Sequence, residues 1–338
     1  MINFQYSRAR DVADAVRQIA ADETAKFIAG GTNLIDLMKD DVERPSRLID
    51  ISRLPLRAVE EAAGGGLRIG ALVPNSDLAY HPLVEQRYPL LSSAILAGAS
   101  QQLRNMASTG GNLLQRTRCL YFYDTATPCN KRQPGSGCSA IGGINRISAI
   151  LGTSEGCIAT HPSDMCVALA ALEAKVHVVG PAGERVIAFD DFHRVPGNTP
   201  QLDTNLHPSE IVTAIELPAQ GFANNYSYLK IRDRLSYAFA LVSVAAALEL
   251  DGAAIRQARL ALGGVAHKPW RDTAAEAELR GKPANKETFE GVANLLLRDA
   301  KGFAHNSFKI DLARRSIVRA LTQAALGTPQ SQSDKKIR

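Results

Sequence analysis

The segment Ala29-Gly30-Gly31-Thr32-Asn33-Leu34 decides how this chain is interpreted, because it joins a predicted strand to a predicted helix. The strand is the apolar run 26–29, and the helix is expected over 32–38. Glycine accepts positive φ angles and lets a ligand approach the backbone closely. Backbone N–H groups at a helix N-terminus can then bind a phosphate without a basic side chain. A Gly-Gly pair is more often only a turn, and no Gly-x-Gly-x-x-Gly fingerprint occurs at this point.

A second glycine pair strengthens the phosphate interpretation. It lies in Ser108-Thr109-Gly110-Gly111-Asn112-Leu113 and is again followed by a polar donor. Two such loops can hold the two phosphates of a dinucleotide from opposite sides. Turn formation alone remains the alternative, and the residues by themselves favour it.

Hydrophobic patterning divides the chain into three predicted units and a tail. The units are residues 1–55, 56–220 and 224–327, and a disordered polar tail is expected over 328–338. In the second unit, Asn75 is expected to cap a helix. Further helices are predicted over 11–21, 88–99, 164–174, 285–300 and 307–326, and strands over 47–51, 67–73, 175–179, 185–189 and 211–217. For residues 227–262 the pattern leaves strand or helix open.

An insert over residues 116–158 interrupts the second unit and holds Cys119, Cys129, Cys138 and Cys157. A structureless segment of this length inside a compact domain is normally functional. Disulfides, zinc and an iron–sulfur cubane are the alternatives, and the absence of a close Cys-x2–4-Cys pair slightly favours the cubane over zinc. Cys166 lies in an apolar helical run, where a buried, inert thiol is expected.

Charge and hydropathy exclude several classes of function. The net charge of +5 and the pI of about 9.0 come from scattered lysines and arginines, with one dense run, Lys335-Lys336-Ile337-Arg338, in the polar tail. This pattern does not indicate nucleic-acid binding. No window approaches the roughly 20 apolar residues that a transmembrane helix needs, so no membrane span is expected. The N-terminus shows no signal peptide, which predicts folding in the cytoplasm.

Considered together, the motifs resemble those of the FAD subunits of the xanthine dehydrogenase family. The motifs that carry the resemblance are Ala29–Leu34, Thr109–Leu113, His161-Pro162-Ser163-Asp164-Met165, Tyr228-Leu229-Lys230 and Tyr237–Val242. The resemblance covers nearly the whole chain and implies an α+β fold. This fold has a two-part FAD-binding domain of the vanillyl-alcohol oxidase and xanthine dehydrogenase type, followed by a C-terminal α/β domain.

The insert is similar to that of the medium subunit of bacterial periplasmic aldehyde oxidoreductases. The similar stretches are 118–124, 128–132, 135–138 and 157–162. That subunit holds FAD and a [4Fe-4S] cluster, and a related cysteine insert occurs in the flavin subunit of hydroxybenzoyl-coenzyme A reductase. The resemblance therefore implies that the four insert cysteines bind a [4Fe-4S] cluster.

The resemblance also assigns the FAD-binding residues. The implied set is Ile28, Ala29, Gly30, Gly31, Thr32, Asn33, Leu34, Thr109, Gly110, Gly111, Asn112, Ser163, Asp164 and Lys230. The two glycine loops would bind the pyrophosphate and nearby ribityl atoms. Ser163 and Asp164 would bind the flavin's hydroxyl chain, and Lys230 would lie near the isoalloxazine. His161 is expected either beside the flavin or as a packing residue. Gln115 departs from relatives that place a hydroxyl residue there, and no role is assigned to it.

The implied function is electron transfer within a molybdenum-dependent aldehyde oxidoreductase. The partners would be a large molybdenum-cofactor subunit, a small [2Fe-2S] subunit and an external electron acceptor. Two alternatives remain: a self-sufficient FAD oxidase, and a non-redox module whose insert is ordered by zinc. The location implied is the periplasm, reached by co-export with a signal-bearing partner, and the alternative is the cytoplasm.

Overall fold

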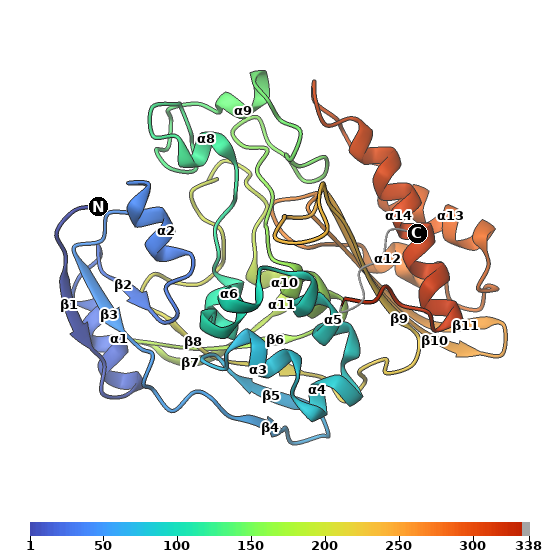
Figure 1. The fold of residues 1–338 in the computed structure, drawn as a ribbon, viewed down its shortest axis with the longest axis horizontal. Coiled ribbons are helices and arrows are strands. Elements are labelled where there is room, and N and C mark those ends of the chain that lie inside the picture. The colour runs from blue at the N-terminus through green and yellow to red at the C-terminus, as the bar shows by residue number, and fades with distance from the viewer. Residues whose placement is uncertain (333–338) are drawn as a thin grey trace.

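The computed structural model describes residues 1–332, and the strands in this range form three sheets (Figure 1). The first sheet is parallel and has the order β1-β3-β2, with strands Gln5–Arg8, Arg47–Asp50 and Lys26–Ile28. Helices α1 (Val12–Ala20) and α2 (Leu34–Lys39) complete this unit. Asp11 begins α1 by accepting a hydrogen bond from the Asp14 amide at 2.7 Å, as an N-cap residue does.

The second sheet is antiparallel, with the order β4-β5-β8-β6-β7. Its strands are β4 (Val59–Glu61), β5 (Leu67–Gly70), β6 (Lys175–Gly180), β7 (Gly183–Ala188) and β8 (Ile211–Leu217). Its helices are α3 (Asn75–Ala79), α4 (Pro82–Arg87), α5 (Pro89–Ala97), α6 (Gln101–Met106), α7 (Thr109–Leu113), α10 (Asp164–Ala171) and α11 (Phe189–Phe192). The chain between β5 and β6 thus carries most of the helices and the insert.

Two local predictions in this unit are wrong. The strand predicted over 67–73 ends at Gly70, because the amides of Gly110 and Thr109 hydrogen-bond the carbonyls of Ala71 and Val73 and so replace sheet pairing. Asn75 is not the N-cap of α3. Pro74 holds that place, and the Asn75 side chain caps nothing.

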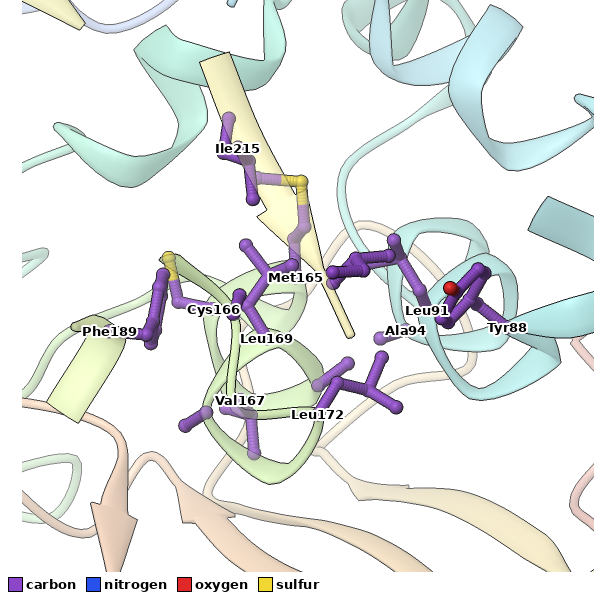
Figure 2. Packing of buried hydrophobic residues seen from close by; sticks show 14 of the residues in the cluster. Tyr88, Leu91, Ala94, Met165, Cys166, Val167, Leu169, Leu172, Phe189 and Ile215 are labelled. Carbon is purple, nitrogen blue, oxygen red and sulfur yellow. The ribbon is translucent and has the colours of Figure 1, made fainter. Parts of the chain in front are cut away.

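The core of the second unit is built around α5 and α10, which are apolar on nearly all sides. Leu91, Ala94 and Leu169 are almost completely buried between them. Figure 2 shows Met165 reaching toward Ile215 of β8. Helices that are apolar all round are typical of a domain centre, so these two fix the positions of the elements around them.

The C-terminal unit is an antiparallel sheet of order β12-β11-β10-β9, covered on both faces. Its strands are β9 (Tyr226–Ile231), β10 (Val242–Asp251), β11 (Ala254–Gly263) and β12 (Trp270–Arg271), and its helices are α12 (Thr273–Ala277), α13 (Lys286–Leu296) and α14 (Phe308–Leu326). Helix α14 packs on β9 and β10, while α5 and α10 of the second unit also contact this sheet. The pattern left open over 227–262 is therefore resolved as strands.

The insert has little regular structure of its own. It carries the single-turn helices α8 (Leu120–Tyr123) and α9 (Ser139–Gly142), and its end is fastened to the C-terminal unit. The ammonium group of buried Lys309 donates to the carbonyls of Ser148 at 2.8 Å and Gly264 at 2.6 Å. The Asn306 side chain donates to the carbonyls of Ser148 and Ala149. These hydrogen bonds hold the end of the insert in place, although the insert has little secondary structure.

Replacing Lys309 with methionine is expected to lower the free energy of unfolding by about 1–3 kcal/mol, since buried carbonyls lose their donor. Urea unfolding followed by circular dichroism measures the effect. Lys286→Met is the matched control, because this lysine is exposed and only pairs with Glu290 at 3.6 Å. Equal stability of the two variants would contradict the clamping role of Lys309.

The described end of the chain differs from the disordered tail predicted over 328–338. Gln330 accepts a hydrogen bond from the Lys230 amide, and Gln332 donates to the Tyr228 carbonyl, so this segment lies along β9. Residues 333–338 lie outside the described range. Across residues 1–332, no helix is both long enough and apolar enough to cross a bilayer.

Candidate functional site

A cavity of about 1430 Å³ opens where the three units meet. This volume exceeds the roughly 300–1,000 Å³ of an ordinary small-ligand pocket, so an elongated ligand fits. Every predicted cofactor-binding residue except Thr109 lines it: Ile28, Ala29, Gly30, Gly31, Thr32, Asn33, Leu34, Gly110, Gly111, Asn112, Ser163, Asp164 and Lys230. Thr109 is buried behind the wall, and its hydroxyl donates to the Val73 carbonyl at 2.8 Å.

The first glycine loop has the geometry of an anion site. Gly31 has a φ of 72°, and a Cβ on Gly30 would lie 1.8 Å from the carbonyl oxygen of Met106. Both positions therefore require glycine, one for its conformation and the other for space. Within the described chain, the amides of residues 30–33 donate to no protein atom. These N–H groups precede α2 in the cavity wall, where a phosphate can accept from them.

The second glycine pair lies in a helix and not in the predicted loop. Gly110 and Gly111 lie inside α7 rather than in a loop, because Ser108 caps this helix by accepting from the Gly111 amide at 3.2 Å. The Gly110 amide is also taken, by the Ala71 carbonyl at 2.7 Å. A Cβ on Gly110 would approach that of Ala71 to 2.9 Å. The pair therefore allows α7 to pack closely against the end of β5, while its amides are not free to bind phosphate.

Two asparagines leave polar atoms without a partner in the cavity wall. The Asn33 side-chain nitrogen and the Asn75 side-chain oxygen are buried, and neither has a hydrogen-bond partner among the described residues. A buried polar group without a partner costs about 1–3 kcal/mol. The Asn33 nitrogen can therefore donate a hydrogen bond to a ligand in the cavity, and the Asn75 oxygen can accept one.

A buried ion pair forms another part of the wall. The Lys230 ammonium lies 2.7 Å from the Asp164 carboxylate and donates to the Ala97 carbonyl at 3.1 Å. The Tyr228 hydroxyl donates to the other Asp164 oxygen at 2.7 Å. Burial raises the pKa of Tyr228 well above 10, so the hydroxyl remains a donor. Asp164 thus contacts two residues of β9, Tyr228 and Lys230. The Lys230 ammonium lines the cavity and is already paired with the Asp164 carboxylate.

The four insert cysteines line one small second cavity, together with Lys131. All four are free thiols. Burial raises the pKa of Cys119, and it raises the pKa of Cys157 to about 12. Cys129 and Cys138 face each other in an antiparallel bridge. The structure thus brings together all the residues that the sequence analysis assigned to a metal site.

The spacing of these thiols bears on the kind of metal. Among the described residues, the insert cysteines do not form a group of three or more whose ligand atoms already lie close enough to share one metal ion. A single zinc ion with bonds of about 2.3 Å holds its four thiolates close together. A cubane binds each thiolate to a different iron, so its thiolates lie further apart.

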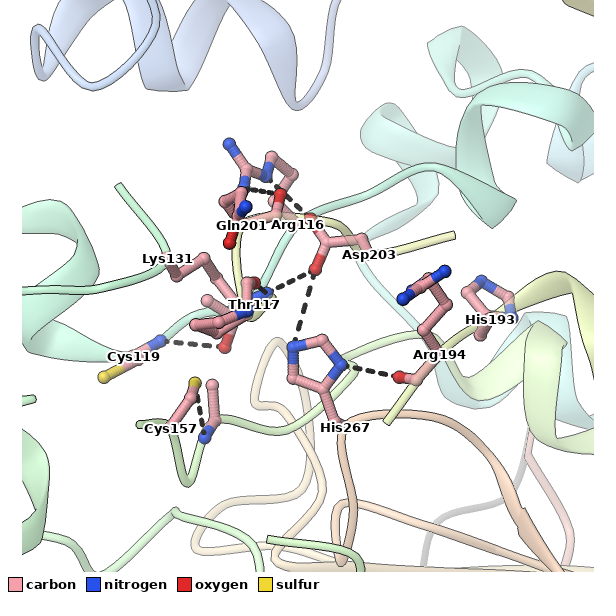
Figure 3. Close-up of polar contacts among 12 residues, drawn as sticks. Arg116, Thr117, Cys119, Lys131, Cys157, His193, Arg194, Gln201, Asp203 and His267 are labelled. Carbon is pink, nitrogen blue, oxygen red and sulfur yellow. Dashed lines mark hydrogen bonds and ion pairs between the residues drawn. The ribbon is translucent and has the colours of Figure 1, made fainter. Parts of the chain in front are cut away.

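An ion-pair network connects the two cavities (Figure 3). Asp203 lies 2.5 Å from the Lys131 ammonium, which lines the small cavity, and 2.8 Å from Arg116, which lines the large one. Burial opposes ionisation, but Lys131 and Arg116 hold the pKa of Asp203 well below its usual range. His267 lies 3.7 Å from the same carboxylate, and burial lowers its pKa to about 4. The ion pairs of Asp203 with Lys131 and Arg116 thus lie between the two cavities and contact the wall of each.

The structure also places His161 and Gln115, to which no single role was assigned from the sequence. His161 does not line the large cavity and packs against His193, with ring centroids 4.3 Å apart. Gln115 lines the cavity and donates to Asn112 at 2.9 Å. Sequence reasoning missed several cavity-lining residues, namely Asn75, Arg104, Arg116, Arg234, Tyr237 and Phe239. Tyr237 and Phe239 belong to the motif Tyr237–Val242, so this motif is the sequence feature that could have identified them.

Comparison with known families matches both parts of the chain. Residues 2–220 match the FAD binding domain in molybdopterin dehydrogenase, and residues 226–324 match the CO dehydrogenase flavoprotein C-terminal domain. The boundary between the two matches falls between β8 and β9. The matches include the insert and every residue assigned to either cavity.

Individual relatives and solved structures agree with these matches. The chain is 51% identical over 322 residues to the aldehyde oxidoreductase FAD-binding subunit PaoB of Escherichia coli, covering 95% of this chain and 98% of the relative. It is 28% identical to the glyceraldehyde dehydrogenase medium chain of Sulfolobus acidocaldarius, covering 86% of each. A carbon monoxide dehydrogenase chain from Hydrogenophaga pseudoflava superposes with a TM-score of 0.76 and 26% identity, covering 97% of this chain and 99% of that one.

Proposed function

Since the chain belongs to the FAD-binding medium subunits of the molybdenum hydroxylase family, we propose that it is the electron-transfer subunit of a molybdenum-dependent aldehyde oxidoreductase. The predicted family, flavin and fold class are confirmed by this membership. The observation that carries the aldehyde assignment is the 51% identity to an aldehyde oxidoreductase subunit over 95% of this chain. The proposed partners are a large molybdenum-cofactor subunit, a small [2Fe-2S] subunit and an external electron acceptor.

FAD fits the large cavity through groups that the protein leaves unpaired. The free amides of residues 30–33 would hold the pyrophosphate, and Asn33 and Asn75 offer a donor and an acceptor. When bound, FAD supplies two-electron chemistry, while the protein positions it and sets its potential. Lys230 provides a fixed positive charge in the wall, and its pairing with Asp164 limits its movement.

A [4Fe-4S] cluster is proposed for the small cavity. Its ligands would be Cys119, Cys129, Cys138 and Cys157, since four thiolates are the usual ligand set of a cubane. The cluster would supply one-electron chemistry or hold the insert together. Because four thiolates are strongly negative, the nearby Lys131 ammonium would stabilise them.

The decisive test is a visible spectrum of the anaerobically purified chain, combined with iron and zinc analysis. Flavin bands above a broad iron–sulfur absorbance, with about four irons per chain, are expected. A chain with one zinc and no iron would contradict the cluster. Aldehyde-dependent dye reduction by the chain alone would favour the self-sufficient oxidase over an electron-transfer subunit.

Cysteine substitutions provide a matched test of the same cluster. Replacing Cys129 or Cys157 with serine is expected to reduce the iron content from about four per chain to near zero, because a cubane missing one thiolate is weakly held. Cys166→Ala is the control, because this cysteine does not line the small cavity. Iron that is retained by the serine variants, or lost equally in the control, would refute the ligand assignment.

We further propose that the subunit works in the periplasm, after export in the folded state with a partner that bears the signal. Support comes from the insert's similarity to the medium subunits of periplasmic aldehyde oxidoreductases. Cell fractionation tests this when the chain is produced with and without its partners. Cytoplasmic recovery in both cases would favour the alternative location.

A further inference from the structure

Behind the wall of the large cavity lies a second group of side chains with metal-ligand atoms, which is distinct from the four insert cysteines. His161, Cys166 and His193 are all buried, and their ligand atoms lie within 4.8 Å of one another. Three segments bring them together. His161 lies in the irregular segment before α10, Cys166 lies in α10, and His193 directly follows α11. A metal ion bound by three ligands at about 2.0–2.3 Å would require these three ligand atoms to move only slightly closer together.

The His193 imidazole already has the arrangement of a metal ligand. One ring nitrogen of His193 bonds the Leu113 carbonyl at 2.8 Å, which makes it the N–H donor. The other nitrogen, Nδ1, is therefore a lone-pair acceptor, and it has no partner among the described residues. Metal-binding histidines commonly donate their second nitrogen to a backbone carbonyl in this way. His161 likewise leaves its Nε2 buried without a partner.

The surroundings keep both rings neutral, which metal binding requires. Burial lowers the pKa of His193 to about 4 and that of His161 well below 6.5. Phe189 and Phe192 pack their rings against His193, with centroids 5.5 and 4.9 Å away. Cys166 and Phe189 belong to the same buried apolar cluster (Figure 2). The group thus offers two imidazole nitrogens and one thiol inside an apolar shell.

From this geometry we propose that His161, Cys166 and His193 form a binding site for one cuprous ion. Binding would replace the Cys166 thiol proton with the metal, and the proton would leave to solvent. Cu⁺ with one thiolate and two neutral imidazoles is uncharged. Zn²⁺ would leave a buried positive charge, which is costly, and it normally needs a fourth ligand. Soft thiolate ligands also select Cu⁺.

The site would connect the segments that build the flavin cavity. His193 is bonded to Leu113 at the end of α7, and Ser163, which begins α10, lines the large cavity. A bound ion would therefore link α10, through Cys166, to α7, through His193 and the Leu113 carbonyl. This role is independent of the proposed iron–sulfur cluster, because the two groups share no residue.

The test loads the purified full-length chain anaerobically with acetonitrile-stabilised Cu⁺ and then challenges it with a bathocuproine chelator. About one chelator-resistant copper per chain is expected, with a fall of at least about tenfold in Cys166→Ala and His193→Gln. His177→Gln is the control and should retain the copper, because this histidine pairs with Glu216 at 2.9 Å and lines neither cavity. Flavin absorbance shows that each variant is folded.

X-ray absorption of the loaded wild-type chain gives a readout that needs no substitution, and one sulfur with two nitrogens around copper is expected. Equal copper in the wild type and Cys166→Ala, or loss of copper only in His177→Gln, would overturn the proposal. Retention of Zn²⁺ but not Cu⁺ under the same challenge would also overturn it.

Discussion

Replacing Lys230 with methionine is expected to lower the free energy of unfolding by about 3–5 kcal/mol, which is the cost of breaking a buried ion pair from one side. Lys230 and Asp164 are both buried, at 5% and 8% exposure, with their charged atoms 2.7 Å apart. Without the ammonium, the carboxylate would keep only the Tyr228 hydroxyl as a partner. Urea unfolding at neutral pH measures the loss, and the flavin bound per chain is measured on the same sample.

Two comparisons make this prediction specific to the buried pair. Lys282→Met removes an exposed lysine that pairs with Glu278 at 3.4 Å, and its effect should stay within about 0.5 kcal/mol. The double variant Lys230→Met/Asp164→Asn removes both charges and should be more stable than Lys230→Met alone. If Lys230→Met unfolds like Lys282→Met, the pair does not support the cavity wall.

Substituting alanine for Gly30 is expected to abolish tight flavin binding. The new Cβ would lie 1.8 Å from the Met106 carbonyl oxygen, so the loop or the end of α6 must move. Such a movement displaces the free amides of residues 30–33, which we assign to the pyrophosphate. Misplacing several charge-assisted hydrogen bonds of about 1.5–3 kcal/mol each weakens binding by at least about a hundredfold. Bound FAD per purified chain is the measurement.

The matched control is Gly291→Ala. A Cβ at Gly291 meets no heavy atom within 4 Å, and this glycine lies in the interior of α13. Alanine there should retain the flavin and stabilise the chain by about 0.5–1 kcal/mol through higher helix propensity. A Gly30→Ala protein that retains full flavin would show that the loop is not the phosphate site.

Much of the local structure could be predicted because the signals lie within short windows. Helix α14 and the hairpin of β6 and β7 follow directly from apolar periodicity and a Gly-Pro-Ala-Gly turn. The first glycine loop also has the predicted positive φ, at Gly31. The helical setting of the second glycine pair was not predicted, because glycines that permit a close approach of α7 and β5 cannot be distinguished by sequence from glycines in a phosphate-binding loop.

The parts that could not be predicted depend on contacts between distant segments. Lys131 meets Asp203 across 72 residues, and Arg116 meets the same aspartate across 87. A buried charge becomes stable only when its partner arrives from elsewhere in the fold, so no local pattern marks it. The same limit applies to Cys166. Its burial was predicted correctly, but the two histidines beside it come from outside α10.

The clamp between Lys309 and the end of the insert has a consequence for biosynthesis. Lys309 follows Ser148 by 161 residues, so the ribosome completes the insert long before it completes the clamp. At about 5–20 residues per second, this interval is on the order of ten seconds. During that time the end of the insert is not yet fastened to the C-terminal unit. The nascent insert is therefore held only by contacts within the first two units until α14 has been synthesised.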